Sequence, residues 1–204
     1  MATSYSGFTY EDLETLNIKV ERKRFLPNNL AEVQPTDWLT TTLRKNLNLP
    51  LASEKAKSEH IIAPILTEMV EQNHQSFTYF SGYTFDVDKS IGLKGRCDFI
   101  LSSDPFAPRI SAPVFNIVEA KNDNLDVGVP QCIAQMYAAQ LFNQRKKNTV
   151  NTIYGIVTIG SAWNFIKLED STVYIDNDIF YLNELSRLLG AFQQVIDFYI
   201  KPKK

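Results

Sequence analysis

Cysteine and histidine are scarce in this 204-residue chain, which contains two of each. Cys97 and Cys132 are too few for a disulfide framework, and they cannot complete a four-ligand zinc site on their own. His60 and His74 are likewise too few for a histidine-rich metal centre. The sequence therefore argues against a disulfide-stapled protein and against a site built mainly from sulfur and imidazole ligands.

Long apolar runs are also missing from the chain. No segment is long and apolar enough to cross a bilayer, and the start, MATSYSGFTYEDLE, lacks a basic stretch followed by an apolar signal core. These features predict a cytoplasmic protein that does not enter a membrane. Repeats and low-complexity stretches are absent too, and a composition of 44% hydrophobic and 22% charged residues is ordinary for a globular domain.

A strong charge of either sign is lacking, because the formal net charge is −2. A strongly basic balance would indicate nucleic-acid binding directly, but local basic patches matter more than the total. Three patches occur, KVERKRF at 19–25, RKK at 145–147 and KPKK at 201–204. Each patch taken alone is interpreted as a solvated face or a chain end, so nucleic acid stays open as a partner.

The spacing of apolar residues predicts a single α/β domain. Helical spacing favours helices over 9–17, 35–47, 53–75, 129–147 and 183–201. Alternating patterns and β-rich composition favour strands over 18–26, 77–87, 95–103, 113–121, 152–160, 162–169 and 171–176. This order predicts a mixed central β-sheet flanked by helices. Residues 1–50 are expected to form an N-terminal lead-in packed on a core of residues 51–204, with Pro64 kinking the first core helix.

The segment NIVEAKND, at 116–123, ends a predicted buried strand with charged residues. Glu119 and Lys121 lie two residues apart, so their side chains point to the same face of the sheet. Asp98 lies in the preceding predicted strand, and neighbouring strands bring their residues within about 5 Å of each other. Two carboxylates and an amine at one strand end can hold Mg²⁺ or form a buried salt bridge. The spacing alone does not choose between these two interpretations.

The arrangement of Asp98 in one strand and Glu119-Ala120-Lys121 in the next resembles the site of the PD-(D/E)XK nuclease superfamily. The likeness covers roughly Glu54 to Trp163. It rests on the stretches SEKAKSEHIIAPIL, GRCDFI, IVEAKN, QCIAQM and IYGIVTIGSAWNF, which are similar to those of small uncharacterised bacterial members. One departure is Cys97, which stands where the family's pattern has a proline before the aspartate. The resemblance implies a restriction-endonuclease-like core with the element order αβββαβ.

The resemblance also implies a metal site and a reaction. Asp98, Glu119 and the carbonyl of Ala120 would ligate Mg²⁺, with Mn²⁺ as a substitute, and Lys121 would assist the attacking water. The implied activity is that of a metal-dependent endonuclease that hydrolyses the phosphodiester bonds of nucleic acid, DNA ahead of RNA. Enzymes of this fold often act as dimers on two strands, so a homodimer is a candidate assembly.

Two further positions follow from the same resemblance, each with an alternative. Gln131 or Gln135, four residues apart on the next helix, would orient the lysine or contact a phosphate, and Gln131 is preferred. An acid of the first core helix, Glu59 or Glu54, would bind a second metal or position metal-bound water. Glu59 is preferred because it is expected on the same side as the apolar residues that pack towards the sheet.

Two other functions compete with the nuclease. One is a non-catalytic module on the same fold that binds nucleic acid or a partner protein. The other is a structural core in which Asp98 and Lys121 form a salt bridge. Outside the site, Asp86 and Asp88 are expected to end a strand and cap a turn, while the two cysteines and Trp163 are expected to pack in the core.

Overall fold

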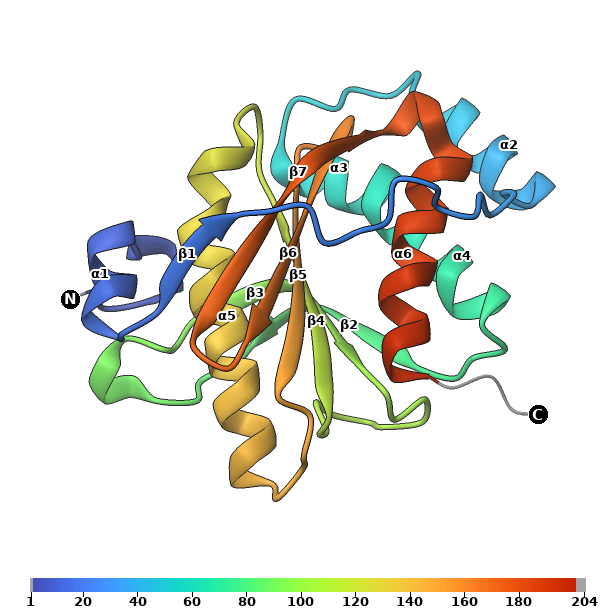
Figure 1. Cartoon of the computed structure of the whole chain (residues 1–204). Coiled ribbons are helices and arrows are strands. Elements are labelled where there is room, and N and C mark those ends of the chain that lie inside the picture. Colours follow the sequence, from blue (N-terminus) through green and yellow to red (C-terminus); the bar gives the residue numbers. More distant parts are fainter. Residues whose placement is uncertain (1, 201–204) are drawn as a thin grey trace.

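Seven strands form one sheet, and helices cover both of its faces (Figure 1). The computed structural model describes residues 2–200 of the chain. The strands are β1 (Lys19–Arg22), β2 (Thr78–Thr84), β3 (Arg96–Ser102), β4 (Val114–Ala120), β5 (Thr152–Thr158), β6 (Ala162–Glu169) and β7 (Thr172–Tyr181). The α-helices are α1 (Tyr10–Thr15), α2 (Asp37–Asn46), α3 (Glu54–Lys57), α4 (Ala63–Gln72), α5 (Leu125–Arg145) and α6 (Leu185–Tyr199). Shorter turns are the π segment η2 (Ser58–Ile62) and the 3-10 turns η1 (Tyr5–Gly7), η3 (Lys89–Ile91) and η4 (Leu182–Glu184).

The strands lie across the sheet in the order β1-β7-β6-β5-β4-β3-β2. β2, β3 and β4 pair antiparallel in sequence, and so do β5, β6 and β7. α5 crosses over between β4 and its parallel neighbour β5, and β1 pairs parallel with β7 at one edge of the sheet. The predicted α/β class, with a mixed sheet flanked by helices, is therefore confirmed.

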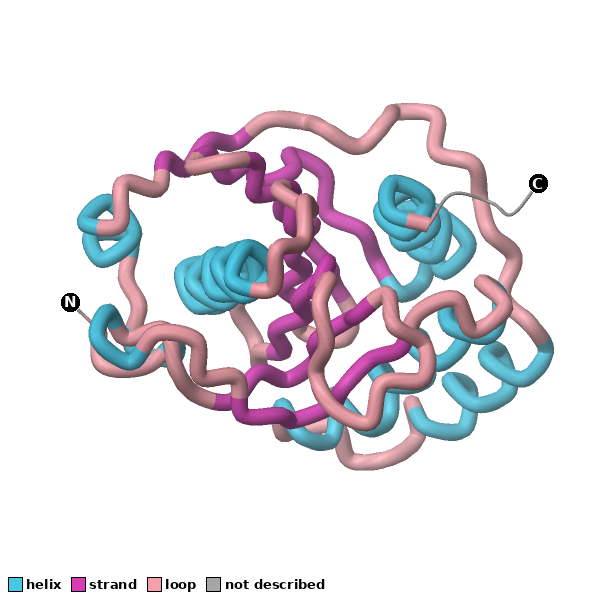
Figure 2. The backbone as a smooth tube through the Cα atoms, turned by 90° about the horizontal axis from the view of Figure 1, so that it is seen from below, coloured by secondary structure: helices cyan, strands magenta, loops and turns pink. Residues whose placement is uncertain are grey.

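Each face of the sheet carries its own hydrophobic core, with α5 on one side and α2, α4 and α6 on the other (Figure 2). The core under α5 includes Ile133, Met136 and both cysteines. The core under α4 and α6 includes Leu66, Phe192 and Trp163. The apolar faces predicted for these helices are thus the buried ones, and the cysteines and the tryptophan pack inside as expected.

The helix that contains Pro64 includes a π segment just before the proline. α3, η2 and α4 follow one another without a break, and η2 directly precedes the turn that contains Pro64. Proline has no backbone N–H, so the carbonyl of His60, four residues earlier, would lose its partner in a regular α-helix. Asn46 Nδ2 at the end of α2 donates to that carbonyl at 2.8 Å. The wide turn and this side-chain bond together accommodate the proline within a continuous helix.

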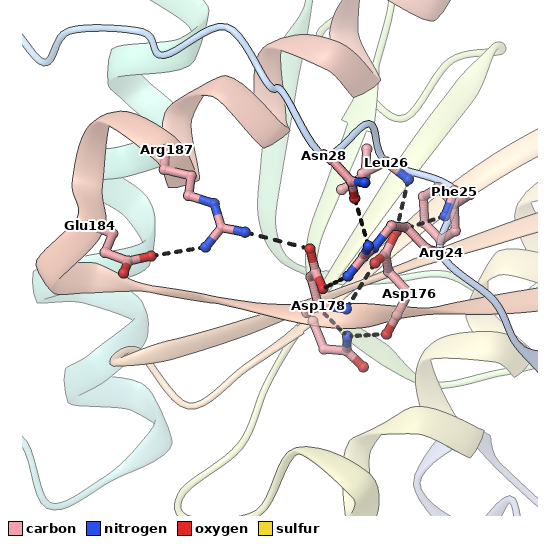
Figure 3. Close-up of polar contacts among 9 residues, drawn as sticks. Arg24, Phe25, Leu26, Asn28, Asp176, Asp178, Glu184 and Arg187 are labelled. Atoms are coloured by element: carbon pink, nitrogen blue, oxygen red, sulfur yellow. Dashed lines mark hydrogen bonds and ion pairs between the residues drawn. The ribbon is translucent and has the colours of Figure 1, made fainter.

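The N-terminal segment contributes β1 to the sheet and is then held by a buried carboxylate of β7 (Figure 3). Asp176 is fully buried, and its Oδ2 accepts the backbone N–H groups of Phe25 at 3.0 Å and Leu26 at 2.9 Å. Its Oδ1 accepts the backbone N–H of Asp178 at 2.9 Å. One side chain therefore satisfies three backbone donors that come from two distant parts of the sequence.

Asp178, two residues further along β7, joins this segment to α6 (Figure 3). Its carboxylate pairs with Arg24 Nη2 at 2.7 Å and with Arg187 Nη2 at 3.5 Å. Arg24 also donates to Asn28 at 2.6 Å, and Arg187 pairs with Glu184 at 3.1 Å. The network fixes the path of the chain between β1 and α2.

Ion pairs within the chain occupy parts of the two basic patches that the structure describes. Arg22 of patch 19–25 pairs with Asp126 at 3.1 Å. Arg145 of patch 145–147 pairs with Asp88 at 2.8 Å. The third patch, 201–204, lies outside the described residues. Part of the positive charge in the first two patches is therefore balanced locally.

The predicted turn caps are confirmed. Asp88 accepts the backbone N–H of Ser90 at 3.1 Å and caps η3, and Asp86 accepts the backbone N–H of Gly95 at 3.0 Å.

Within residues 2–200, no helix is both long and apolar enough to span a membrane.

Candidate active site

The ends of β3 and β4 separate at the position where the acidic residues lie. The antiparallel register pairs Phe99 with Val118, and continuing it by one residue sets Asp98 opposite Glu119. At this point the carboxylate of Asp98, rather than a backbone carbonyl, accepts the N–H of Ala120 at 2.8 Å. On the other side of β4, the backbone N–H of Lys121 donates to the carbonyl of β5 at Thr158, also at 2.8 Å. The strand end is therefore fixed on both sides, and one of the fixing groups is the Asp98 side chain.

Glu119 and Lys121 contact each other as the two-residue spacing predicts. Lys121 Nζ lies 2.7 Å from Glu119 Oε1 and 3.1 Å from Gln131 Oε1. Gln135 Nε2 donates to Glu119 Oε2 at 2.8 Å. The two glutamines, one turn apart on α5, therefore each hold one member of the Glu119–Lys121 pair. The sequence left Gln131 and Gln135 as alternatives, whereas the structure uses both.

The first turn of α5 lies close to the lysine because it contains a glycine. A Cβ atom at Gly128 would lie 2.9 Å from Lys121 Cγ and 2.7 Å from Val157 Cγ1. Both distances are shorter than side-chain carbons tolerate, so a larger residue would push the helix or the lysine away. The lysine stem is therefore packed in place, and its amine is directed by Glu119 and Gln131.

The buried carboxyl groups of the site hold their protons unusually tightly. Glu119 is only 1% exposed, and burial together with repulsion from Asp98 raises its pKa to about 7. Burial also raises the pKa of Asp98, against the opposing effects of the Ala120 N–H and of Lys121. Burial lowers the pKa of Lys121, but its attraction to Glu119 and the hydrogen bond between them outweigh this, so the net direction is upward. Lys121 is therefore a cation at neutral pH.

The preference for Glu59 as the acid of the first helix does not agree with the geometry. The Glu59 side chain is 55% exposed and pairs with Lys55 at 2.7 Å, and the hydrogen bond from Lys55 lowers its pKa. Glu54 is half-buried, and its charge acts on the pKa of both Asp98 and Lys121. The structure therefore directs Glu59 towards solvent, and of the two acids Glu54 is the one whose charge reaches Asp98 and Lys121.

Lys57 is a residue of this region that the sequence did not single out. It lies one turn after Glu54, and its side chain is 14% exposed. Its ammonium group donates to the carbonyl of Asn122 and lies 3.8 Å from Asp123. Lys57 thus joins the first core helix to the loop that follows Lys121. The spacing of three residues from Glu54 was the only signal in the sequence that could have indicated it.

Comparison with known proteins adds no identity. No protein-family model matches the chain, and no curated protein matches it significantly. The site must therefore be interpreted from its own geometry.

The donor set of the site suits a hard cation in part. Asp98 and Glu119 are carboxylates on adjacent strand ends, and burial followed by repulsion from Asp98 raises the pKa of Glu119, which a bound cation would lower. Within residues 2–200, no group of three or more His, Cys, Asp or Glu side chains is arranged to hold a metal ion. Ala120 buries its side chain in the core on the opposite face, away from Glu119 and Lys121. A ligand role for its carbonyl stays a prediction.

The raised pKa of Glu119 predicts a pH dependence of stability. The unfolded carboxyl releases its proton above about pH 4.5, whereas the folded one holds it up to about pH 7. The unfolded state therefore binds fewer protons across this window, and stability falls as the pH rises through it. The titration of Lys121 lies well above this window and does not contribute to the change.

Replacing Glu119 by glutamine should remove the fall in stability that the titration of Glu119 causes between pH 4.5 and 7. Between pH 4.5 and 8 the parent is expected to lose up to about 3 kcal/mol of unfolding free energy relative to Glu119→Gln. Urea denaturation of both proteins at several pH values measures the difference. If the two stability profiles run parallel across the window, Glu119 does not titrate as described.

Proposed function

We propose that this protein is a Mg²⁺-dependent nuclease with a restriction-endonuclease-like core, and that it hydrolyses phosphodiester bonds in nucleic acid, DNA foremost. The observation that carries the proposal is the convergence of Asp98, Glu119 and Lys121 at the ends of two adjacent strands, with Gln131 touching the lysine amine. Burial, and after it repulsion from Asp98, makes the Glu119 carboxylate harder to ionise, and a cation bound between the two acids would offset both effects.

Asp98 and Glu119 are the residues that would hold the ion, and Glu54, whose charge acts on Asp98, would bind a water beside it or a second ion. Mg²⁺, when bound, supplies a Lewis acid that polarises a phosphoryl oxygen and acidifies water. Hydrolysis requires attack of water on phosphorus, cleavage of the bond to the leaving oxygen, and protonation of that oxygen.

Lys121 has a defined part in this reaction. Because its pKa is shifted upward, it carries a proton at neutral pH and acts as a hydrogen-bond donor rather than as a base. Its ammonium group can donate to the attacking water or to the phosphoryl oxygen on which negative charge develops. Gln131 accepts one of its three protons and so limits the directions in which the others point.

The test is cleavage of plasmid, linear duplex and single-stranded DNA, and of RNA, with Mg²⁺ or Mn²⁺ added and with EDTA as the control. We expect products that depend on the added metal, that disappear with EDTA, and that are absent when Glu119→Ala replaces the parent. Nucleic-acid binding by a parent that cleaves no substrate with either metal would instead support the non-catalytic module. A parent that neither binds nor cleaves would leave the structural salt bridge as the explanation.

A further inference from the structure

Arg96 is a cation close to the site that forms no ion pair with an acidic side chain of the described residues. It lies two residues before Asp98 at the start of β3, and its side chain is exposed. Within residues 2–200 it forms no ion pair and no side-chain hydrogen bond. Lys121 and Lys57, by contrast, are engaged with Glu119 and with the loop after β4, respectively. Arg96 is therefore a cation beside the site that is available to an external anion.

A glycine on the neighbouring strand makes room for the Arg96 guanidinium. A Cβ atom at Gly82 would lie 2.4 Å from Arg96 Nη2 and 3.0 Å from Nε, so any side chain there would displace the arginine. Gly82 also has φ +65°, a conformation that side chains other than glycine seldom adopt. The missing side chain at Gly82 thus lets the guanidinium lie against the backbone of β2.

The register of the sheet sets this surface beside Asp98. β2 and β3 pair Ser81 with Phe99 and Tyr83 with Cys97, so Gly82 lies opposite Asp98. The pairing is interrupted only between these two positions, where the glycine bends the strand. Because the guanidinium rests on Gly82, its charge is close enough to lower the pKa of Asp98, yet it forms no ion pair with that carboxylate.

We propose that Arg96, supported by Gly82, binds a backbone phosphate of the nucleic-acid substrate next to the phosphate that a cation held by Asp98 and Glu119 would bind. This inference rests on the proposed function and adds a substrate-binding residue to it. A guanidinium presents parallel N–H groups that match two phosphate oxygens, which an ammonium group cannot do. Lying against a strand, it also loses little side-chain freedom when the phosphate binds. Arg96 would therefore fix the substrate backbone relative to the acidic residues.

The experiment measures binding without cleavage. Fluorescently labelled duplex and single-stranded DNA oligonucleotides are titrated in EDTA at several salt concentrations with the parent, Arg96→Gln and Arg96→Lys. We expect Arg96→Gln to raise the Kd about tenfold and to reduce the slope of log K against log salt by about one, because one phosphate contact is lost. Arg96→Lys should keep most of the slope but recover only part of the affinity, since it keeps the charge and loses the paired contact.

Arg109 provides the matched control. It is an exposed arginine in the loop between β3 and β4, at the other end of the same strands. Arg109→Gln should change the Kd by less than about twofold and leave the salt slope unchanged. Far-UV circular dichroism of all variants checks that the fold is retained. Equal effects of Arg96→Gln and Arg109→Gln would mean that general charge, not this position, governs binding, and would overturn the inference.

The outcomes separate this inference from the proposed function. If the parent cleaves DNA with Mg²⁺ but Arg96→Gln keeps the parent's Kd and salt slope, the nuclease stands and the role of Arg96 is wrong. If the parent binds with an Arg96-dependent slope but never cleaves, the phosphate contact stands and the nuclease does not. A parent that binds no nucleic acid in EDTA and cleaves none with Mg²⁺ or Mn²⁺ overturns both.

Discussion

Lys121→Met is expected to lower the rate of metal-dependent cleavage about 1,000-fold. Methionine keeps much of the packed stem beside Gly128 and removes the amine that contacts Glu119 and Gln131. The substrate would then lose the donor that stabilises developing charge, while its other contacts remain. The rate under single-turnover conditions should therefore fall far more than the affinity measured in EDTA, which we expect to change less than about fivefold.

Loss of the amine also leaves Glu119 buried without its ion partner, so stability must be measured beside activity. Glu59→Gln is the control for rate, because Glu59 lies on the same first helix as Glu54 but pairs only with Lys55 at the surface. It should keep the parent's cleavage rate within about twofold. A Lys121→Met protein that is folded and cleaves at more than a tenth of the parent's rate would show that the amine is not part of the chemistry.

Local pattern was sufficient to predict the framework of the site. Glu119 and Lys121 follow a run of apolar residues, so a two-residue strand repeat sets both side chains on one face, and the structure has them in contact. The helix that follows has glutamines four residues apart, which places both on one face of the helix. The residues of each pair lie close together in the sequence, and the strand and helix repeats that place them on one face vary little between proteins. They therefore follow from the sequence without knowledge of the tertiary structure.

The preference for Glu59 over Glu54 does not fit the structure, because it overlooked a feature that the local sequence pattern does not show. The argument for Glu59 assumed a regular α-helix, in which a residue three before Ile62 lies near the same face. Glu59 instead lies within η2, where each turn holds more residues and the angle between these positions widens. The π turn depends on Pro64 and on the bond from Asn46 of α2, and only the proline is visible in the helix sequence.

The pairing of β1 with β7 could not be predicted from the sequence either. The strand itself was predicted, but its parallel partner lies about 150 residues away, and no local signal links them. What holds the following segment is Asp176, which in the sequence is one acid among several near the end of a strand. Its burial and two of its three backbone contacts depend on how residues 23–26 pass over β7. Long-range contacts of this kind are set by the whole fold and not by spacing.

Asp176→Ala is expected to destabilise the protein by about 3–4 kcal/mol. The change leaves the backbone N–H groups of Phe25, Leu26 and Asp178 without their acceptor, and the first two have no strand partner to replace it. Each buried donor left without a partner costs about 1–3 kcal/mol, and removal of the buried carboxylate offsets part of the total because it no longer has to be kept out of water. The loss should appear in urea denaturation as a lower midpoint.

Two variants show whether the cost comes from the lost acceptors. Asp176→Asn keeps the shape and one acceptor oxygen, so it should recover about half of the loss. Asn177→Ala, at the exposed neighbouring position of the same strand, should change stability by less than about 0.5 kcal/mol. Because Asp176 anchors the segment after β1, hydrogen exchange in Asp176→Ala should increase first at residues 23–26, before the central strands β4 and β5 are affected. If all three variants were equally stable, the three bonds of Asp176 would not hold the N-terminal segment, and the packing of β1 against β7 would have to do so instead.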